Sequence, residues 1–432
     1  MNVLMVTVGV PHPQRGGGAN RSFQLLRYLQ AGGDRVRLIC VAMSNQEQDL
    51  DAAREICEHV AVVPYFGGPS WQPRLRSGHA RLDRYLTLLT EPPYRYAHTF
   101  AAALRVRVRA QLAAMAIDGL VAETTCPAFL LAPLARTRSI PAVADLHDIE
   151  SVLHERSSLL EGTTTGPWIL AKRKVTTQKI RAAERTIAAT YPLCVVTSHH
   201  DAAALDRVAR RRVRAVVVPN GVDTAYFQSM CSVSAQPDTL VFTGLMAHAP
   251  NADGVRYFCA EVLPLIWQRR PSVRLLVAGA DPTPDVRALD QGATGRVRVL
   301  GAVPDTRPYL AESSVAVVPL RSGSGTRLKI LEALAMERPV VSTTIGVEGL
   351  EVVAGRHLLI ADQPAAFAAA VLRLLEDRVL AKRLAAEGRA LVERRYRWDA
   401  IGREWQQHLH DLARRLPSVL GMAPTGIETV GF

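Results

Sequence analysis

Apolar and polar residues follow one another along the chain in a repeating strand and helix order. Short apolar runs bounded by turn residues predict strands that are buried on both faces, and amphipathic stretches between them predict helices. In the first half of the chain, the expected strands are residues 2–8, 36–41, 61–63, 119–121, 142–146, 194–196 and 215–218. Buried strands separated by helices are typical of a parallel, doubly wound sheet.

The pattern is interrupted once and then starts again. Residues 228–238 (QSMCSVSAQPD) lose periodicity and become small and polar, as a linker does. Further strands are expected at residues 239–242, 274–277, 297–300, 315–318 and 340–341, with helices that begin near Asn251, Pro284, Asp305, Thr326 and Pro364. We therefore predict an α/β fold of two Rossmann-like doubly wound domains, residues 1–227 and 239–396, which face a central cleft. A helix over residues 397–416 is expected to return to the first domain, and residues 417–432 form a tail.

Composition narrows the class of protein. The chain has 432 residues, of which 48% are hydrophobic and 21% charged, as in a folded globular protein. The formal net charge is +12, but only five of the 52 basic residues are lysine, an arginine bias that indicates codon usage in a GC-rich bacterial genome. No basic stretch is interleaved with aromatic residues in a nucleic-acid-binding pattern, so we expect no nucleic-acid partner.

The cysteines and the apolar runs bear on location. The six cysteines are scattered without C-x-x-C spacing, which predicts free thiols in a reducing cytoplasm. Residues 2–10 lack a basic leader and a cleavage site, and no apolar run reaches the ~18 residues that a spanning helix needs, so we expect a cytoplasmic protein. Two basic amphipathic stretches, residues 71–84 and 168–185, leave two interpretations open: peripheral contact with the inner face of a membrane, or surface helices beside the cleft.

The most informative segment is residues 317–336 (VVPLRSGSGTRLKILEALAM), which predicts a buried strand, a Gly/Ser turn and a helix. Amides at a helix start form an anion site that needs no metal, and Arg327 and Lys329 add two cations, with Arg321 a candidate third. A diphosphate is the best-fitting ligand. Glu332 lies among apolar residues, where a ribose diol would supply the two donors that a carboxylate needs. Two alternatives remain open, a weak pair with Lys329 and a turn that serves packing alone.

Several segments, taken in order, resemble the retaining GT-B glycosyltransferases of family 4. They are residues 218–223 (VPNGVD), 242–246 (FTGLM), 250–254 (PNADG), 301–305 (GAVPD), 322–336 and 338–342 (RPVVS). The resemblance spans residues 2–412. It implies transfer of a sugar from a nucleoside-diphosphate sugar to an acceptor hydroxyl with retention, without a metal ion or other cofactor.

The resemblance also assigns the donor contacts. It places Glu332 on the ribose, and amides and basic side chains on the diphosphate. The expected contacts are Gly17, Gly18, Gly244, Ser322, Gly323, Ser324, Gly325, Thr326, Arg327, Leu328, Lys329 and Glu332. Two departures stand out: Ser324 replaces a glutamate that contacts the donor sugar, and the usual Arg and Lys after the first strand of the second domain are absent. We infer that Arg327 and Lys329 supply the missing charge.

In the first domain, residues 143–151 (VADLHDIES) follow a predicted strand, where open α/β sheets place ligands. The resemblance matches His147 to a histidine near the reacting carbon, which makes His147, Arg327 and Lys329 the predicted catalytic set. A partly buried, hydrogen-bonded histidine is the alternative. The glycine turn formed by residues 16–18 is expected to face the cleft. Arg21, Glu123 and Asp148 are candidates for contacts on the acceptor side.

Asp49 and Asp51 form an Asp-x-Asp motif, which lies in an acidic, helix-like stretch. We interpret it as a solvated helix face and expect no metal site.

The predicted function is glycosyl transfer for a surface glycan or a glycosylated natural product. A non-catalytic nucleotide-sugar-binding partner subunit, or an epimerase or phosphorylase on the same fold, remains an alternative.

Overall fold

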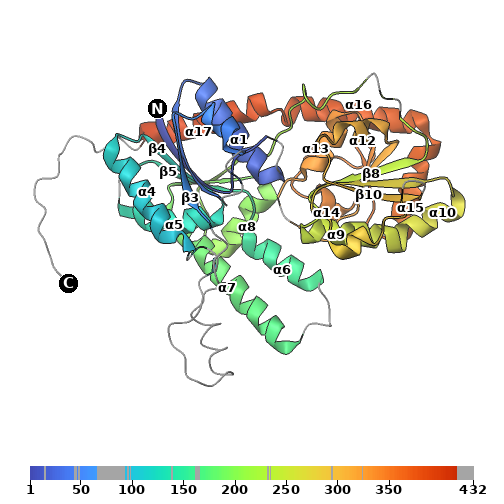
Figure 1. Cartoon of the computed structure of the whole chain (residues 1–432), viewed down its shortest axis with the longest axis horizontal. Helices are drawn as coiled ribbons and strands as arrows, with labels where there is room; N and C mark the ends of the chain where they lie inside the picture. Colours follow the sequence, from blue (N-terminus) through green and yellow to red (C-terminus); the bar gives the residue numbers. More distant parts are fainter. Residues whose placement is uncertain are drawn as a thin grey trace, which may run out of the picture.

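The computed structural model describes residues 1–415 except 14–15, 43–45, 47–48, 66–92, 95–96, 98, 138–139, 161–165, 231–232, 234, 293–294 and 324. Ser324, the basic stretch 71–84 and the tail 417–432 therefore lie outside the described residues. Figure 1 shows two α/β domains side by side, with the last helices running along both of them.

The first domain contains a parallel sheet in the order β3-β2-β1-β4-β5-β6-β7. Its strands are β1 (Asn2–Val8), β2 (Arg35–Ala42), β3 (His59–Pro64), β4 (Gly119–Glu123), β5 (Ala142–Leu146), β6 (Leu193–Val196) and β7 (Ala215–Val217). Its helices are α1 (Gly16–Ala31), α2 (Asp51–Arg54), α4 (Ala101–Ala114), α5 (Thr125–Thr137), α6 (Glu150–Leu160), α7 (Pro167–Thr190) and α8 (His199–Ala209). In β1, Met5 is in register with Leu38 of β2 on one side and Val121 of β4 on the other, and all three side chains are buried.

The second domain repeats this plan with a parallel sheet in the order β10-β9-β8-β11-β12-β13. Its strands are β8 (Thr239–Thr243), β9 (Arg274–Ala278), β10 (Val297–Gly301), β11 (Val315–Val318), β12 (Val340–Ser342) and β13 (Leu359–Ile360). Its helices are α9 (Ala249–Tyr257), the π-helix η3 (Phe258–Val262), α10 (Leu263–Arg269), α11 (Pro284–Arg287), α12 (Arg307–Glu312), α13 (Leu328–Ala335), α14 (Thr344–Val347), α15 (Pro364–Glu376) and α16 (Arg378–Arg395). The two doubly wound sheets confirm the predicted fold class.

The last helix, α17 (Trp398–Arg415), leaves the second domain and packs on the first. Trp405 is only 1% exposed and belongs to the same apolar cluster as Leu25 and Leu29 of α1. Gln406 donates a hydrogen bond to Asp34 (2.5 Å), the residue before β2. The C-terminal helix therefore returns to the first domain, as predicted.

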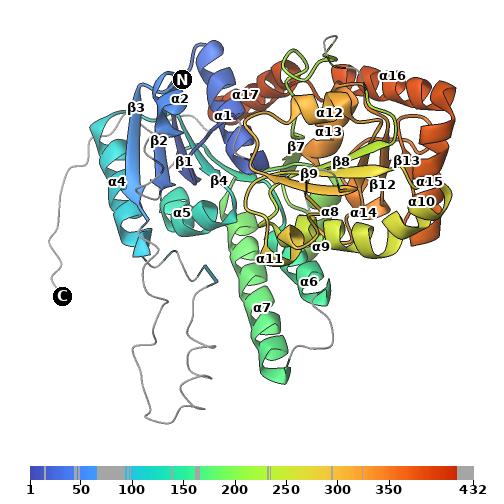
Figure 2. The same ribbon diagram turned by 45° about the vertical axis from the view of Figure 1, so that its right-hand side comes forward.

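Two helices of the first domain, α6 and α7, extend away from its sheet in both views (Figure 2). They pack against each other along their length, and Arg181 of α7 pairs with Glu155 of α6 (2.5 Å). No helix within the described parts of the chain is both long enough and apolar enough to cross a membrane.

Candidate functional site

The two domains meet at the carboxyl ends of their strands, and several of the predicted glycines lie close to other site residues there. A Cβ atom built on Gly17 would lie 3.2 Å from the Leu328 side chain of the second domain. One built on Gly18 would lie 3.4 Å from Nδ1 of His147. Gly325, in the turn after β11, has φ +72° and lies so close to Asp148 that a Cβ there would fall far inside van der Waals contact of its carboxylate. These predicted site residues are therefore brought together from both domains.

One prediction about the glycines is wrong in detail. Residues 16–18 were expected to form a turn before the helix, whereas Gly16, Gly17 and Gly18 are the first residues of α1. Only Gly16 has a positive φ, +65°. Gly17 still faces Leu328 of the other domain, and Gly18 still faces His147. The absence of side chains at the two glycines lets the start of α1 lie directly against these residues.

Two cations of the second domain are held at the start of α13. Arg327 is 8% exposed and donates to the Gly325 carbonyl (2.7 Å), which ties its side chain to the glycine turn. Lys329 donates to Oδ1 of Asn251 (2.7 Å) and lies over the Phe242 ring (3.9 Å). Burial lowers the pKa of Lys329 to about 7, and the neighbouring Arg327 charge acts in the same direction. An anion placed beside these two groups would relieve both effects.

Gly244 makes room for the Lys329 amine. Its φ is +146°, and a Cβ there would lie 2.7 Å from Nζ of Lys329 and 3.0 Å from Nδ2 of Asn251. Asn251 also donates to the Leu245 carbonyl (2.8 Å), which fixes its side-chain oxygen toward the lysine. The sequence did not single out Asn251 as a partner of Lys329, because 78 residues separate them.

Glu332 follows on the same helix without a partner. Within the described residues its carboxylate accepts no hydrogen bond and has no cation within ion-pair distance. The predicted alternative of an intrahelical pair with Lys329 is present only as a longer-range attraction between the two charges. Burial raises the pKa of Glu332 to about 7, against the opposing charge of Lys329. A ligand with hydroxyl donors would satisfy this carboxylate, as a ribose does.

Arg321 does not join the cations of the site. Its guanidinium pairs with Asp253 of α9 (2.6 Å) and lies over the Tyr257 ring (4.6 Å). The expectation of a third phosphate-binding cation at this position is therefore not supported by its contacts.

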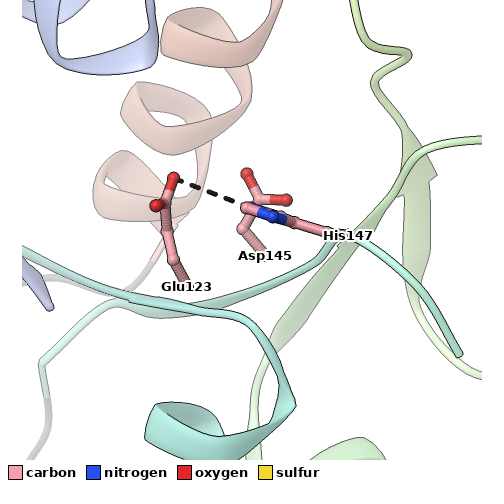
Figure 3. A group of neighbouring side chains, drawn as sticks. All are labelled: Glu123, Asp145 and His147. Atoms are coloured by element: carbon pink, nitrogen blue, oxygen red, sulfur yellow. Dashed lines mark ion pairs between the residues drawn. The ribbon is translucent and has the colours of Figure 1, made fainter. Parts of the chain in front are cut away.

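Three polar residues of the first domain gather where β4 and β5 end (Figure 3). Nε2 of His147 lies 4.0 Å from Oε1 of Glu123, and Asp145 lies beside them. Burial lowers the pKa of His147 to about 4. Burial, and next to it the Asp145 charge, raises the pKa of Glu123 to about 8. Both shifts favour the uncharged form of the group, a neutral His147 and a protonated Glu123.

Arg21 was predicted to contact phosphate or acceptor, and the structure gives it another role. The side chain is 0% exposed, and its guanidinium donates to both carboxylate oxygens of Asp145 (3.0 and 3.1 Å). It also donates to the carbonyls of Val218 and Pro219 and to the side chain of Asn220. Arg21 faces the sheet and neutralises Asp145, so it is not available to a ligand.

The same cluster is the place where a metal ion would be sought. Glu123, Asp145 and His147 each offer a ligand atom, all within 4.8 Å of one another. These residues fit a metal ion poorly, because the Arg21 guanidinium already occupies both oxygens of Asp145 and would repel a metal cation.

The Asp-x-Asp motif lies elsewhere in the first domain. Asp51 is exposed and pairs with Arg54 (2.9 Å), but Asp49 is only 9% exposed, so the predicted solvated helix face is wrong for Asp49.

An ion pair that the sequence did not reveal joins the two domains. Arg156 of α6 binds both oxygens of Glu348, which follows α14, with Nη2 to Oε1 at 3.0 Å. Its Nη1 also donates to the Gly323 carbonyl (3.1 Å), and His200 of α8 lies 3.3 Å from Glu348. Because 192 residues separate Arg156 from Glu348, no local spacing could have indicated the pair.

Both domains match families of known proteins. Residues 16–221 match the glycosyl transferase 4-like domain, and residues 237–377 match glycosyl transferases group 1. The chain is 30% identical over 198 residues to the phosphatidyl-myo-inositol mannosyltransferase of Mycobacterium tuberculosis, a match that covers 43% of this chain and 51% of that protein. The match thus spans about half the length of the curated relative.

Two solved structures cover nearly the whole chain. Sucrose-phosphate synthase from Thermosynechococcus elongatus has a TM-score of 0.69 at 18% identity, with 95% of this chain and 99% of that chain covered. Anabaena HepE in complex with UDP has a TM-score of 0.66 at 17% identity, with 95% and 100% covered. At these identities the likeness establishes the fold, which is the two-domain GT-B fold.

Proposed function

Because the chain belongs to the group 1 glycosyl transferases, with a first domain of the 4-like type, we propose that it transfers a sugar from a nucleoside-diphosphate sugar to an acceptor hydroxyl. The observation that supports this most is the pair of cations, Arg327 and Lys329, held beside a glycine turn at a helix start. This arrangement fits a diphosphate, with Glu332 on the ribose. The fold neighbour HepE is described in complex with UDP, which agrees with a donor of this class.

The proposed reaction proceeds with retention and without a metal ion. The bond from the anomeric carbon to the diphosphate oxygen breaks, and the acceptor oxygen bonds to that carbon from the same face. The acceptor proton passes to the departing diphosphate. Arg327 and Lys329 stabilise the charge that develops on the diphosphate, which is the largest barrier-lowering effect in this scheme. His147 is neutral at pH 7, so it contributes hydrogen bonds near the reacting carbon rather than charge.

We also propose a place for the donor base in the second domain. A cavity of about 470 Å³ lies at the carboxyl ends of β9 and β10. It is lined by Asp281, Pro282 and Arg287 on one side and by residues 299–302 on the other. Ligands of open α/β sheets bind at this edge, so we propose that the cavity receives the base.

The function is tested by incubating the protein with labelled nucleoside-diphosphate sugars and a panel of hydroxyl acceptors. We expect release of the nucleoside diphosphate with transfer of the label, activity that survives chelation of metals, and a product whose anomeric configuration matches the donor by NMR. Isomerised donor without transfer would identify an epimerase instead. Absence of turnover with every donor, together with tight nucleotide binding, would favour the partner-subunit alternative.

We also propose that the acceptor side works at a membrane surface. At its N-terminal end, α7 exposes Ile169 (47%) and Leu170 (44%), followed within four residues by the exposed Lys174. Exposed apolar side chains beside cations suit an anionic lipid surface. The double variant I169D/L170D is expected to lose sedimentation with anionic vesicles, whereas V379D, on an equally apolar but distant exposed position of α16, is expected to retain it. Equal loss in both would contradict the proposal.

A further inference from the structure

Glu123 and His147 each have one buried polar atom that lacks a hydrogen bond, and the two atoms face each other. Oε1 of Glu123 and Nε2 of His147 have no hydrogen-bond partner and lie 4.0 Å apart. Figure 3 shows both side chains directed toward the same point beyond the ends of β4 and β5. Leaving a buried polar group unsatisfied costs about 1–3 kcal/mol, and a small side-chain rotation would bring these two into contact.

Ser22 lies between Glu123 and the Gly18 carbonyl, and its hydroxyl can donate to only one of them. Its hydroxyl contacts both the Gly18 carbonyl (3.1 Å), one helical turn earlier on α1, and Oε2 of Glu123. A hydroxyl carries a single proton, so it cannot donate to both. If Ser22 donates to Gly18, the proton between Ser22 and Glu123 has to come from the carboxyl group. Oε2 of Glu123 is then the protonated oxygen, and Oε1 is a carbonyl acceptor.

The surrounding charges favour the same state. Asp145, from β5, pairs with Arg21, from α1, and these two charged groups act on both His147 and Glu123. An ionised Glu123 beside Asp145 would place two carboxylates in a buried space with a single guanidinium. Burial and the Asp145 charge accordingly raise the pKa of Glu123 to about 8.

We propose that Glu123 is a protonated positioning residue that holds His147 in the tautomer with its proton on Nε2, so that the Nδ1 lone pair is presented beside Gly18. The proposed state forms a continuous chain of hydrogen bonds, in which His147 donates to Glu123, Glu123 donates to Ser22, and Ser22 donates to the Gly18 carbonyl. Gly18 is part of the arrangement, because its missing side chain leaves Nδ1 accessible, at 3.4 Å from where a Cβ would stand. Nδ1 accepts a hydrogen bond from a hydroxyl of the donor sugar or the acceptor.

The catalytic part of this inference rests on the proposed function, but the tautomer does not. Long-range ¹H–¹⁵N correlation NMR on ligand-free protein labelled in its histidine rings distinguishes Nδ1–H from Nε2–H, and the His147 signals are assigned by their loss in H147Q. We expect a neutral ring with its proton on Nε2 at pH 7. A ring protonated on Nδ1, or a charged ring, would overturn the proposal. If the expected tautomer is found but no donor is turned over, the proposed function fails and the tautomer stands.

Matched variants separate positioning from mere packing. In E123Q the amide donates to Ser22 and its oxygen accepts from Nε2–H, so the tautomer and most of kcat are expected to persist. E123A removes both bonds, and we expect a mixed tautomer and a fall in kcat of about tenfold or more, with KM for the donor little changed. The wild-type kcat is expected to fall as pH rises through about 8, where Glu123 loses its proton, and E123Q should lack this fall. Loss of kcat in a folded E123Q, judged by its melting temperature, would refute the role of Glu123 as a neutral donor.

Discussion

Gly325 offers a sharp test of how closely the two domains approach around the donor. It lies in the turn between β11 and α13 with φ +72°. A Cβ atom built on it would lie 3.2 Å from the His147 carbonyl oxygen of the other domain and closer still to the Asp148 carboxylate. The variant G325A would carry a methyl group into this contact. Gly355 is the matched control, because its φ is +74° and nothing lies within 4 Å of the position that a Cβ would take.

Both variants place an alanine in left-handed backbone, but only G325A also introduces a methyl group into a contact with the other domain. Placing an L residue in left-handed backbone costs roughly 1–2 kcal/mol, so G325A and G355A should lose a similar amount of free energy of unfolding. Only G325A has to displace the Asp148 side chain or move the glycine turn. A misplacement of ~1 Å near a reacting centre can lower the rate by about 100-fold.

We therefore expect G325A to lower kcat/KM for the donor by about 10- to 100-fold, and G355A to change it by less than about twofold. The measurements are steady-state kinetics with a labelled donor, nucleoside-diphosphate affinity by calorimetry, and thermal unfolding to match the stability of the two proteins. Equal kinetics in the two variants would refute the idea that the turn is held against the first domain during catalysis.

Three further predictions concern other parts of the molecule. W405A removes a fully buried side chain where α17 packs on the first domain, and should lower the free energy of unfolding of that domain by about 3–5 kcal/mol in a denaturant titration; a loss below 1 kcal/mol would mean that α17 is not part of its core. The pKa of Lys329 is lowered to about 7, so its amine must be protonated to pair with a diphosphate, and the affinity for a nucleoside diphosphate, measured by calorimetry, should weaken as pH rises through 7. K329R should remove this pH dependence, whereas K382R, which changes an exposed lysine, should keep it. E348Q weakens the ion pair with Arg156 that joins the two domains, and should increase the radius of gyration of the ligand-free protein in X-ray scattering. An unchanged radius of gyration would mean that other contacts hold the two domains together.

Much of the fold could be predicted from the sequence because apolar runs mark strands buried on both faces. Each predicted strand is present, with ends that differ by at most two residues. The failures have local causes. β13 (Leu359–Ile360) is too short to produce a periodic pattern, and the glycines at 16–18 suggested a turn although packing against His147 and Leu328 keeps them in a helix.

The candidate site was predictable where its chemistry is local. Arg327, Lys329 and Glu332 lie within six residues of one another at the start of one predicted helix, so the sequence alone placed them close together. Arg21 was misassigned because its position after a glycine run suggested a ligand contact, whereas its partner, Asp145, is 124 residues away in the sequence. Contacts of that range depend on strand order, which periodicity does not specify.

The protonation states on the two sides of the cleft follow a common logic. The second domain presents the cations Arg327 and Lys329, whose charge an incoming diphosphate would stabilise. The first domain faces them with His147 and Glu123, whose uncharged forms are favoured by burial, and with an Asp145 carboxylate that Arg21 neutralises. An ionised Glu123 would set a negative charge opposite the departing diphosphate and raise the barrier to its release, since charges in a buried cleft are poorly screened. The buried pairing of Arg21 with Asp145 therefore prevents the Asp145 carboxylate from adding a net negative charge to this side of the cleft.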